Sequence, residues 1–318
     1  MSEKIAEGGA KNAKTGASVL FCLLCAASVL LFPSLVSKSL LRSLERFYRC
    51  LLPALFPMMI LSRRLLCALP QKSGPRFFRF CRTFSLTPDS FFLFLTGLLC
   101  GYPLPAALCA ELFSQKRLRA RDAERCAALF DNASPGFLIT FVGNGLLGSV
   151  KYGVFLYIAQ TLAVLCAMRI FSRSEKSPPD GHAFAEKSEK GREPSSLTED
   201  IRRAAHTLLE IAAFTAAFSL AADFAAAFLS AIPLPKSTVG FAAGLLEITD
   251  GCTLLSDCPK EVLFLLLPFL SGLGGASVLC QVRAALPRGL SIRPYLAARA
   301  LIACLMTACF FVMTRISP

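Results

Sequence analysis

Two short polar stretches inside apolar sequence carry the side chains that could bind a small solute. Asn132 and Ser134 lie beside a proline in the first stretch, and Glu247 and Asp250 lie three residues apart in the second. Amide and hydroxyl groups can orient a polar solute without the cost of burying a full charge. Carboxylates inside apolar segments are costly and therefore indicate function. Because positions three apart share one face of a helix, we predict that Glu247 and Asp250 couple the site to protons or cations.

The first polar stretch is also a break in the apolar sequence, and an earlier break has the same character. The tripeptide Gly101-Tyr102-Pro103 forms the earlier break, and residues 131–136 form the next. In hydrocarbon, a broken helix leaves backbone groups unpaired, at a high cost unless protein or trapped water pairs with them. Breaks of this kind line the binding sites of transporters with discontinuous helices. Two other interpretations stay open: proline kinks without a ligand, and polar side chains that only bond the carbonyls freed by the kink.

The predicted binding residues come from these breaks, from the second polar stretch and from a later run of small residues. Small residues also permit close helix packing, which is the alternative interpretation for that run. Gln281 is predicted to hydrogen-bond across helices. The complete set is Gly101, Tyr102, Pro103, Asn132, Ser134, Pro135, Gly136, Glu247, Thr249, Asp250, Gly251, Ser271, Gly274, Gly275, Ser277 and Gln281.

Other chemistries find little support in the residue types. No pattern of nucleophile and base occurs, and His182 and His206 are the only histidines. We therefore predict neither an enzyme nor a metal site nor a cofactor. Most of the 14 cysteines lie in apolar segments, where they act as small hydrophobes. Cys22 and Cys25 have the spacing of a redox or zinc pair but lack a second pair or a histidine partner.

Composition predicts a polytopic membrane protein. The chain has 318 residues, of which 54% are hydrophobic and only 17% are charged, and its mean hydropathy is +0.57. Several apolar runs reach the roughly 20 residues that cross about 30 Å of hydrocarbon. The net charge is +13, and the basic residues lie in loops between these runs. That distribution favours contact with anionic membrane lipids over contact with nucleic acid.

The elements that must hold the candidate site are all predicted to be helices. Residues 17–36 are interpreted as a membrane anchor, for which a cleaved signal peptide is the competing interpretation. Residues 37–50 have the pattern of an amphipathic helix at the membrane surface. Including the anchor, we predict about seven membrane-spanning helices. They cover residues 17–36, 51–69, 126–149, 152–171, 204–229, 261–282 and 295–314.

The apolar run 91–113 lies between two strongly basic flanks. A full crossing would place one of those flanks outside, against the positive-inside tendency. A re-entrant hairpin that turns near residues 101–103 keeps both flanks in the cytoplasm and has arms of roughly 16 Å. Residues 241–255 are too short and too polar for a simple crossing, and we predict that they form a second hairpin that enters from the outer face.

The two hairpins lie in two comparable halves of the chain. Each hairpin segment contains Gly-Leu-Leu, and each precedes a span rich in glycine and serine and then another span. This is the pattern of an inverted repeat. The polar stretch between the halves is typical of a disordered cytoplasmic linker. The predicted regions are an anchor and surface helix at 1–50, a first membrane half at 51–171, the linker at 172–203 and a second membrane half at 204–318.

Seven short motifs occur in order along the chain and resemble those of the sporulation integral membrane protein YlbJ family. That family is similar to the wider group of nucleoside-recognition or Gate-domain membrane proteins. The resemblance covers most of residues 40–315. The motifs are GLLCGYP at 97–103, FDNASP at 130–135, GNGLLGS at 143–149, LEITDG at 246–251, GLGG at 272–275, QV at 281–282 and PYLAAR at 294–299.

The resemblance implies a multi-pass protein with two Gate-like halves in the cell membrane of a sporulating bacterium. It implies a role in making the spore, at the cortex or envelope stage. The first functional hypothesis is that the protein binds or transports a small polar solute, such as a nucleoside or an ion. The second is a non-transporting scaffold or regulator of spore-envelope assembly. The expected partners are membrane lipids, the solute, and a second copy of the chain or other sporulation membrane proteins, but no nucleic acid.

Overall fold

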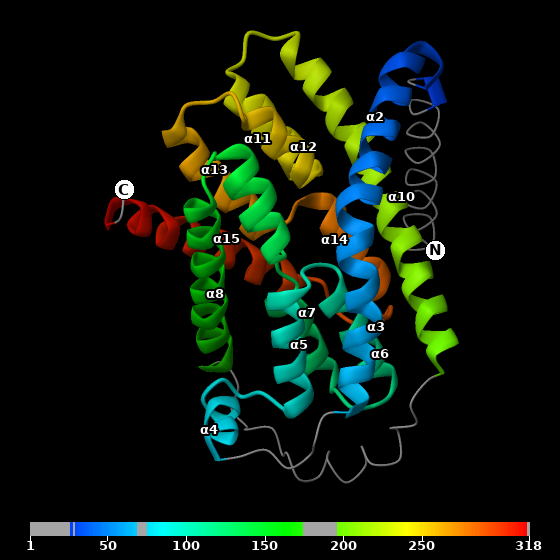
Figure 1. Ribbon diagram of the computed structural model, residues 1–318, viewed down its shortest axis with the longest axis vertical. Coiled ribbons are helices and arrows are strands. Elements are labelled where there is room, and N and C mark those ends of the chain that lie inside the picture. The colour runs from blue at the N-terminus through cyan, green and yellow to red at the C-terminus, as the bar shows by residue number, and fades with distance from the viewer. Residues whose placement is uncertain (1–25, 28, 69–74, 174–195, 317–318) are drawn as a thin grey trace, which may run out of the picture.

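The computed structural model describes residues 26–27, 29–68, 75–173 and 196–316 (Figure 1). Within these residues every regular element is a helix and no strand occurs, which confirms the predicted all-helical class. In chain order the elements are α2 (Pro33–Arg46), η1 (Phe47–Leu51), α3 (Leu52–Ala68), α4 (Pro75–Thr83), α5 (Pro88–Leu99), α6 (Leu104–Ser114), α7 (Ala120–Phe130), η2 (Gly136–Leu146), α8 (Val150–Arg173), α10 (Leu197–Ser230), α11 (Lys236–Leu246), α12 (Ile248–Leu255), α13 (Lys260–Leu273), α14 (Gly275–Ala285) and α15 (Arg293–Ile316).

In the described part of the chain, four helical segments are long and apolar enough to cross a membrane. Shorter apolar helices, α5, α6 and η2, accompany them. These lengths and compositions support the prediction of a multi-pass membrane protein. The four segments are Val150–Ser172, Leu197–Ser230, Lys260–Ala285 and Arg293–Ile316.

The two breaks predicted in the first half are present. α5 ends at Leu99 and α6 begins at Leu104. Between them Gly101 takes a φ of +80°, which glycine adopts without steric cost, and Pro103 lacks the amide hydrogen that a continuing helix needs. α7 likewise ends at Phe130, and η2 follows after a non-helical stretch.

The predicted polar hairpin segment of the second half folds as two short helices. α11 ends at Leu246 and α12 begins at Ile248, so the break lies at Glu247. The two helices approach closely, since a Cβ on Gly251 would lie 2.1 Å from the Cα of Gly244. Only glycine fits at position 251.

A further break divides α13 from α14, inside the span predicted over 261–282. Gly274 has a φ of +90° and Gly275 a φ of +74°, values that favour glycine. The predicted span is present as one long apolar segment, Lys260–Ala285, but its helix is broken at these glycines. The physical reason is that glycine permits a left-handed backbone without requiring it, so its presence alone does not separate a packed helix from a broken one.

The first long helix differs from the predicted surface helix. α2, the π-helical turn η1 and α3 follow one another without a gap from Pro33 to Ala68, and they lie beside α10 (Figure 1). Arg42 of α2 forms an ion pair with Asp223 of α10. A pattern of charges shows which face of a helix is polar, but a membrane surface and a neighbouring polar helix can both cover that face.

The predicted linker ends earlier than expected, because α10 begins at Leu197. The Ser196 hydroxyl accepts a hydrogen bond from the Glu199 backbone N–H at 3.2 Å. Serine followed three residues later by glutamate starts helices by pairing amides of the first turn, and here this capping outweighs the polar composition that indicated disorder. Residues 174–195 of the predicted linker and 17–25 of the predicted anchor lie outside the described residues.

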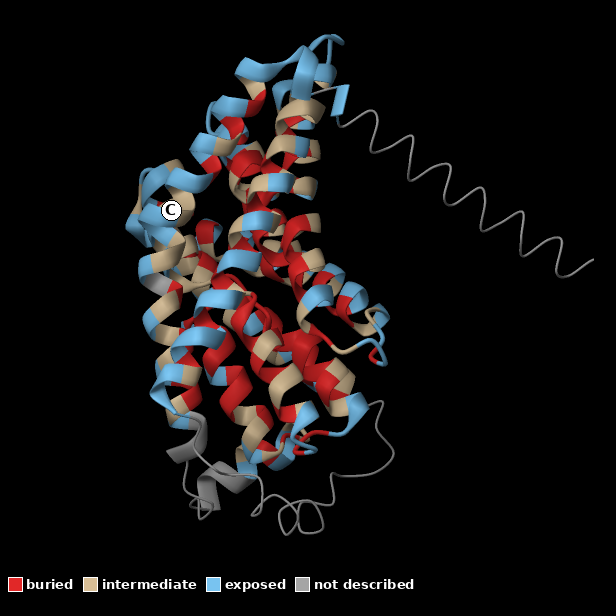
Figure 2. Ribbon diagram, turned by 90° about the vertical axis from the view of Figure 1, so that its right-hand side faces the viewer, coloured by how far each residue is buried: buried red, intermediate tan, exposed pale blue. Residues whose placement is uncertain are grey.

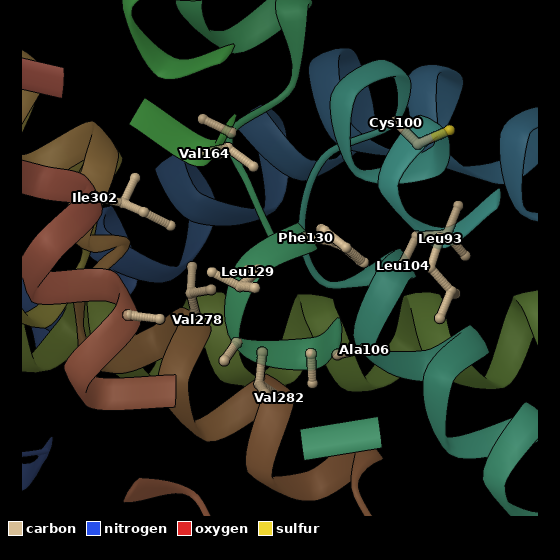
Figure 3. Close-up of a cluster of buried hydrophobic side chains, with 14 of the residues drawn as sticks. Leu93, Cys100, Leu104, Ala106, Leu129, Phe130, Val164, Val278, Val282 and Ile302 are labelled. Carbon is tan, nitrogen blue, oxygen red and sulfur yellow. The ribbon is translucent and has the colours of Figure 1, made fainter. Parts of the chain in front are cut away.

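Apolar side chains fill the space where the broken helices meet the long ones. Buried residues gather in the interior between the helices, whereas the outer surfaces are largely exposed (Figure 2). The close-up shows buried apolar side chains from several helices in one cluster, among them Leu129 and Phe130 of α7, Val278 of α14 and Ile302 of α15 (Figure 3). Many apolar side chains also remain exposed on the outer faces, among them Phe228 at 71%. An apolar exterior of this kind suits contact with lipid.

Gly251→Ala is expected to destabilise the protein although alanine favours helices. The added Cβ overlaps the backbone of Gly244, and overpacking costs roughly 1–3 kcal/mol, against a gain of about 1 kcal/mol in helix propensity. Thermal unfolding in detergent, followed by far-ultraviolet circular dichroism, measures the difference. Gly289→Ala is the control, because nothing lies within 4 Å of a Cβ there. Equal midpoints for the two variants would contradict this packing.

Candidate functional site

The two breaks of the first half pack against each other. The Tyr102 backbone N–H donates to the Asn132 carbonyl at 2.7 Å. A Cβ on Gly101 would lie 2.7 Å from the Cβ of Ser134. The turn between α5 and α6 therefore touches the break between α7 and η2, and the fold brings together the binding residues predicted in these two breaks.

The side chains of Asn132 and Ser134 bond the backbone of their own break. Asn132 Nδ2 donates to the Leu129 carbonyl at 3.0 Å, and Ser134 Oγ accepts from the Phe137 N–H at 3.1 Å. Helix ends leave such groups without partners, so these bonds favour the structural interpretation of the two side chains. A Cβ on Gly136 would have its nearest neighbour at 3.9 Å, which means that packing does not require this glycine.

Gln160 of α8 completes the pairing of this break. The Ala133 N–H donates to Gln160 Oε1 at 3.1 Å, and Gln160 Nε2 donates to the Ala133 carbonyl at 2.9 Å. Gln160 is fully buried. A side-chain amide carries the same donor and acceptor as a peptide group, so Gln160 takes the place of the helical partners that Ala133 lacks.

Arg299 of α15 joins the two halves at their breaks. One terminal nitrogen donates to the Asp131 carbonyl and to Asn132 Oδ1, each at 2.9 Å. The other donates to the Gly272 carbonyl near the end of α13. Only 1% of the Arg299 surface is exposed. Because a guanidinium holds five N–H donors in one rigid plane, a single side chain pairs carbonyls from two separate helix breaks.

One carboxyl and two phenol groups lie beside this bridge. Tyr295 Oη donates to Asp131 Oδ2 at 3.3 Å, whereas Asp131 Oδ1 is buried without a hydrogen-bond partner. The Tyr102 hydroxyl is also buried without a partner, and it interacts electrostatically with the carboxyl groups of Asp131 and Glu247. Both halves of the chain therefore contribute polar groups to one buried cluster.

Glu247 and Asp250 were predicted to share one face of a helix, but Glu247 lies before the helix begins. Glu247 precedes the first turn of α12, where its carboxylate accepts from the Asp250 backbone N–H at 2.8 Å and from the Thr249 hydroxyl at 3.3 Å. This side chain caps the helix, because the extended backbone at Glu247 places it before the helix begins. Asp250 Oδ1 instead pairs with Arg46 of α2 at 2.5 Å, and Asp250 Oδ2 has no hydrogen-bond partner.

The small residues at 271–277 mostly serve packing. A Cβ on Gly275 would lie 3.0 Å from the Gly244 carbonyl oxygen, so α14 begins in contact with α11. Gln281 donates to Ser277 Oγ at 3.2 Å within its own helix. This corrects the predicted bond across helices, since residues four apart are neighbours on a helix. Ser271 is different, because its hydroxyl is fully buried without a partner.

Sequence reasoning missed several members of this site. Arg299 and Gln160 carried a usable signal, since each is a polar residue inside an apolar helix. Tyr295 and Arg46 carried none, because tyrosine at a helix start and arginine in an amphipathic stretch are ordinary there. The name central polar cluster is used below for Tyr102, Asp131, Glu247, Asp250, Tyr295 and Arg299.

The class of the protein rests on its own fold. Comparison of the chain with known protein families, curated proteins and solved structures gave no match. Among the described residues, no three His, Cys, Asp or Glu side chains are grouped so as to hold a metal ion. Over the described residues the protein is all-helical, with four long apolar segments of the length and composition that cross membranes.

Arg299→Gln is expected to destabilise the protein strongly. Buried carbonyls on both sides of the bridge would lose their donors, at about 1–3 kcal/mol each. Arg299→Lys should be nearly as damaging, because one ammonium group cannot reproduce the planar fork. Thermal midpoints in detergent measure both effects, with Arg293→Gln, at an exposed position of the same helix, as control. A midpoint of Arg299→Lys equal to that of the wild type would show that the bridge is not needed.

Proposed function

We propose that this chain is a multi-pass membrane protein that binds a small polar solute between its two halves and moves it across the membrane. The observation that carries the proposal is a set of buried polar atoms without hydrogen-bond partners, at or next to the helix breaks of both halves. These atoms are Tyr102 Oη, Asp131 Oδ1, Asp250 Oδ2 and Ser271 Oγ.

Buried polar atoms without partners are uncommon in folded proteins and cost about 1–3 kcal/mol each. Their presence at helix breaks supports a place where a polar solute or water is exchanged. The hydroxyls of Tyr102 and Ser271 can donate or accept, and the carboxylate oxygens accept. A solute with hydroxyl or amino groups, such as a nucleoside, or a small ion matches this chemistry.

The proposed topology has about seven membrane spans and two re-entrant hairpins in two inverted halves. The order of elements supports it, because each half contains a long helix, two short helices, a broken helix and another long helix in this order. The first half has the additional short helix α4 before its short pair. The short pairs α5–α6 and α11–α12 lie in the lower and upper halves of Figure 1. Four of the proposed spans coincide with the long apolar segments of the described residues, and the other three proposed spans are residues 17–36, 51–69 and 126–149.

A role in a sporulating bacterium is part of the same proposal. It rests on the motifs that resemble the YlbJ family, and several of these motifs coincide with the site. Residues 97–103 and 130–135 contain the first two breaks, and Arg299 ends the last motif. In this proposal the protein acts in the cell membrane during formation of the spore cortex or envelope, and it catalyses no reaction.

A non-transporting scaffold or regulator of spore-envelope assembly is the second candidate. The bonds of Asn132 and Ser134 favour it, because these side chains stabilise their own break and are not free to bind a solute. Under this hypothesis the unpartnered atoms would hold ordered water, which commonly satisfies buried polar groups.

The double variant Tyr102→Phe with Ser271→Ala separates the two candidates. It deletes no hydrogen bond of the described fold, so its thermal midpoint should stay equal to that of the wild type or rise slightly. Under the transport proposal, its affinity for the solute should fall at least about tenfold, which corresponds to about 1.4 kcal/mol. Solute-dependent stabilisation across nucleosides, metal ions and cell-wall precursors measures this change.

Tyr48→Phe is the matched control for this variant, because Tyr48 is 69% exposed. It should behave as the wild type in both measurements. If no solute stabilises the wild type, and the double variant folds normally and supports normal spore resistance, only the scaffold candidate remains.

Two ion pairs attach the short helix pairs to the long helix of α2 and α3. Glu111 of α6 pairs with Arg63 of α3 at 3.0 Å and with Arg203 of α10 at 2.9 Å. Asp250 of α12 pairs with Arg46 of α2. Each carboxylate lies on the second helix of its pair. Each short helix pair therefore has its own attachment to this long helix, which supports a mechanism in which the two pairs move separately.

Breaking one attachment is expected to loosen one short helix pair and to leave the other unchanged. Cys109 on α6 and Cys252 on α12 are both fully buried. Glu111→Gln should speed alkylation of Cys109 several-fold and leave Cys252 unchanged, and Asp250→Asn should do the reverse. Brief treatment with N-ethylmaleimide in detergent, read by peptide mass spectrometry, measures both cysteines. Parallel changes at the two cysteines in either variant would argue against separate attachments.

A further inference from the structure

The ionisable groups at the centre of the described structure do not balance. Three carboxylates, at Asp131, Glu247 and Asp250, lie with two guanidinium groups, at Arg46 and Arg299. The three acids are at most 5% exposed. An uncompensated charge in a dry interior or at membrane depth is costly. The cluster therefore requires one additional positive charge.

The Asp131 carboxylate is held by weaker contacts than an ion pair. The Arg299 charge, the Tyr295 hydroxyl and the Ala106 backbone act on it, but Oδ1 accepts no hydrogen bond of normal geometry. The Glu247 carboxylate accepts bonds from Thr249 and from the Asp250 backbone, and Asp250 pairs with Arg46. The Arg299 terminal nitrogens, by contrast, donate to backbone carbonyls and to an amide oxygen and not to the Asp131 carboxylate. The one hydrogen bond to that carboxylate with good geometry comes from a tyrosine at 3.3 Å, and its Oδ1 has none.

Hydroxyl groups without partners supply a second, independent observation. The buried Tyr102 hydroxyl has no partner and interacts electrostatically with both Asp131 and Glu247. The fully buried Ser271 hydroxyl also has no partner, and it immediately precedes Gly272, whose carbonyl binds Arg299. A hydroxyl can accept from a protonated carboxyl or offer an oxygen to a cation.

We propose that Asp131 binds the coupling ion of this site, a single positive charge carried as a proton or as a monovalent metal cation. This rests on the proposed function and deepens it, because it moves the coupling role from Glu247 and Asp250, where the sequence predicted it, to the break in the first half. Asp131 is well placed for coupling, since its own carbonyl takes part in the Arg299 bridge between the halves.

The ionisable groups that face Asp131 come from three neighbouring elements. Arg299 and Tyr295 face it from α15, Tyr102 faces it from the turn between α5 and α6, and Cys109 faces it from α6. Gain or loss of the ion at Asp131 therefore changes the electrostatic attraction between the first break, the hairpin turn and the last helix at once.

The test uses the full-length wild-type protein in detergent, with thermal midpoints followed by circular dichroism. Samples at about pH 6 and about pH 8 contain choline, sodium or potassium chloride. A protein that holds an additional proton when folded loses stability as pH rises. For a proton, the midpoint should fall by about 4 °C or more between the two pH values in all three salts. For a metal cation, sodium or potassium should restore the midpoint at the higher pH.

Asp131→Asn removes the uncompensated charge and should abolish the dependence on pH and cation. Glu261→Gln, at an exposed position of α13, should retain it. If Asp131→Asn does not fold, infrared difference spectra of the wild type decide the proton case through loss of a protonated-carboxyl band at the higher pH. Wild-type midpoints without any pH or cation effect, or an unchanged effect in Asp131→Asn, would overturn the proposal. Solute-dependent stabilisation that persists in that event would leave the proposed function standing.

Discussion

Buried backbone at the helix breaks must be hydrogen-bonded, and one arginine meets that requirement for both halves of the molecule. Arg299 donates to the break after α7 and to the last turn of α13. Lipid cannot supply such donors. The two halves are therefore tied together at the point where each is least able to satisfy its own backbone.

The helix breaks leave backbone groups that need hydrogen-bond partners, and the same breaks form the candidate site. The side chains of Gln160 and Asn132 hydrogen-bond backbone groups of the break. The Tyr102 hydroxyl and Asp131 Oδ1 have no such partner, so a ligand could bind them. In the proposed transporter, the residues that keep the breaks intact differ from the residues that bind. The polarity of a break is therefore a poor guide to which of its side chains touch the solute.

The central polar cluster is connected to the ion pairs that hold the short helix pairs. Asp250 belongs to the central polar cluster and also anchors α12 to α2 through Arg46, whereas Glu111 anchors α6 to α3 and α10. A change in the charge of the cluster thus acts directly on one attachment of a short helix pair. This connection gives a physical route from ion binding to opening of the site.

Much of the architecture follows from local properties of the chain. Hydropathy and length determine the long apolar helices, and proline and glycine at 101–103 and 131–136 disfavour a continuous helix, so the long apolar helices and the first breaks could be predicted. Ser196 and Glu199 have the spacing of a helix cap. The polar composition of residues 172–203 predicted a linker instead, so the start of α10 was not predicted.

Only the tertiary structure decided which polar groups pair. Arg46 and Asp250 are 204 residues apart, and Arg299 and Asp131 are 168 apart. Such contacts depend on how whole helices pack, and no local pattern encodes them. For the same reason, the sequence alone marked 131–136 as a break, whereas the fold assigned Asn132 to the backbone and left Asp131 without a full partner.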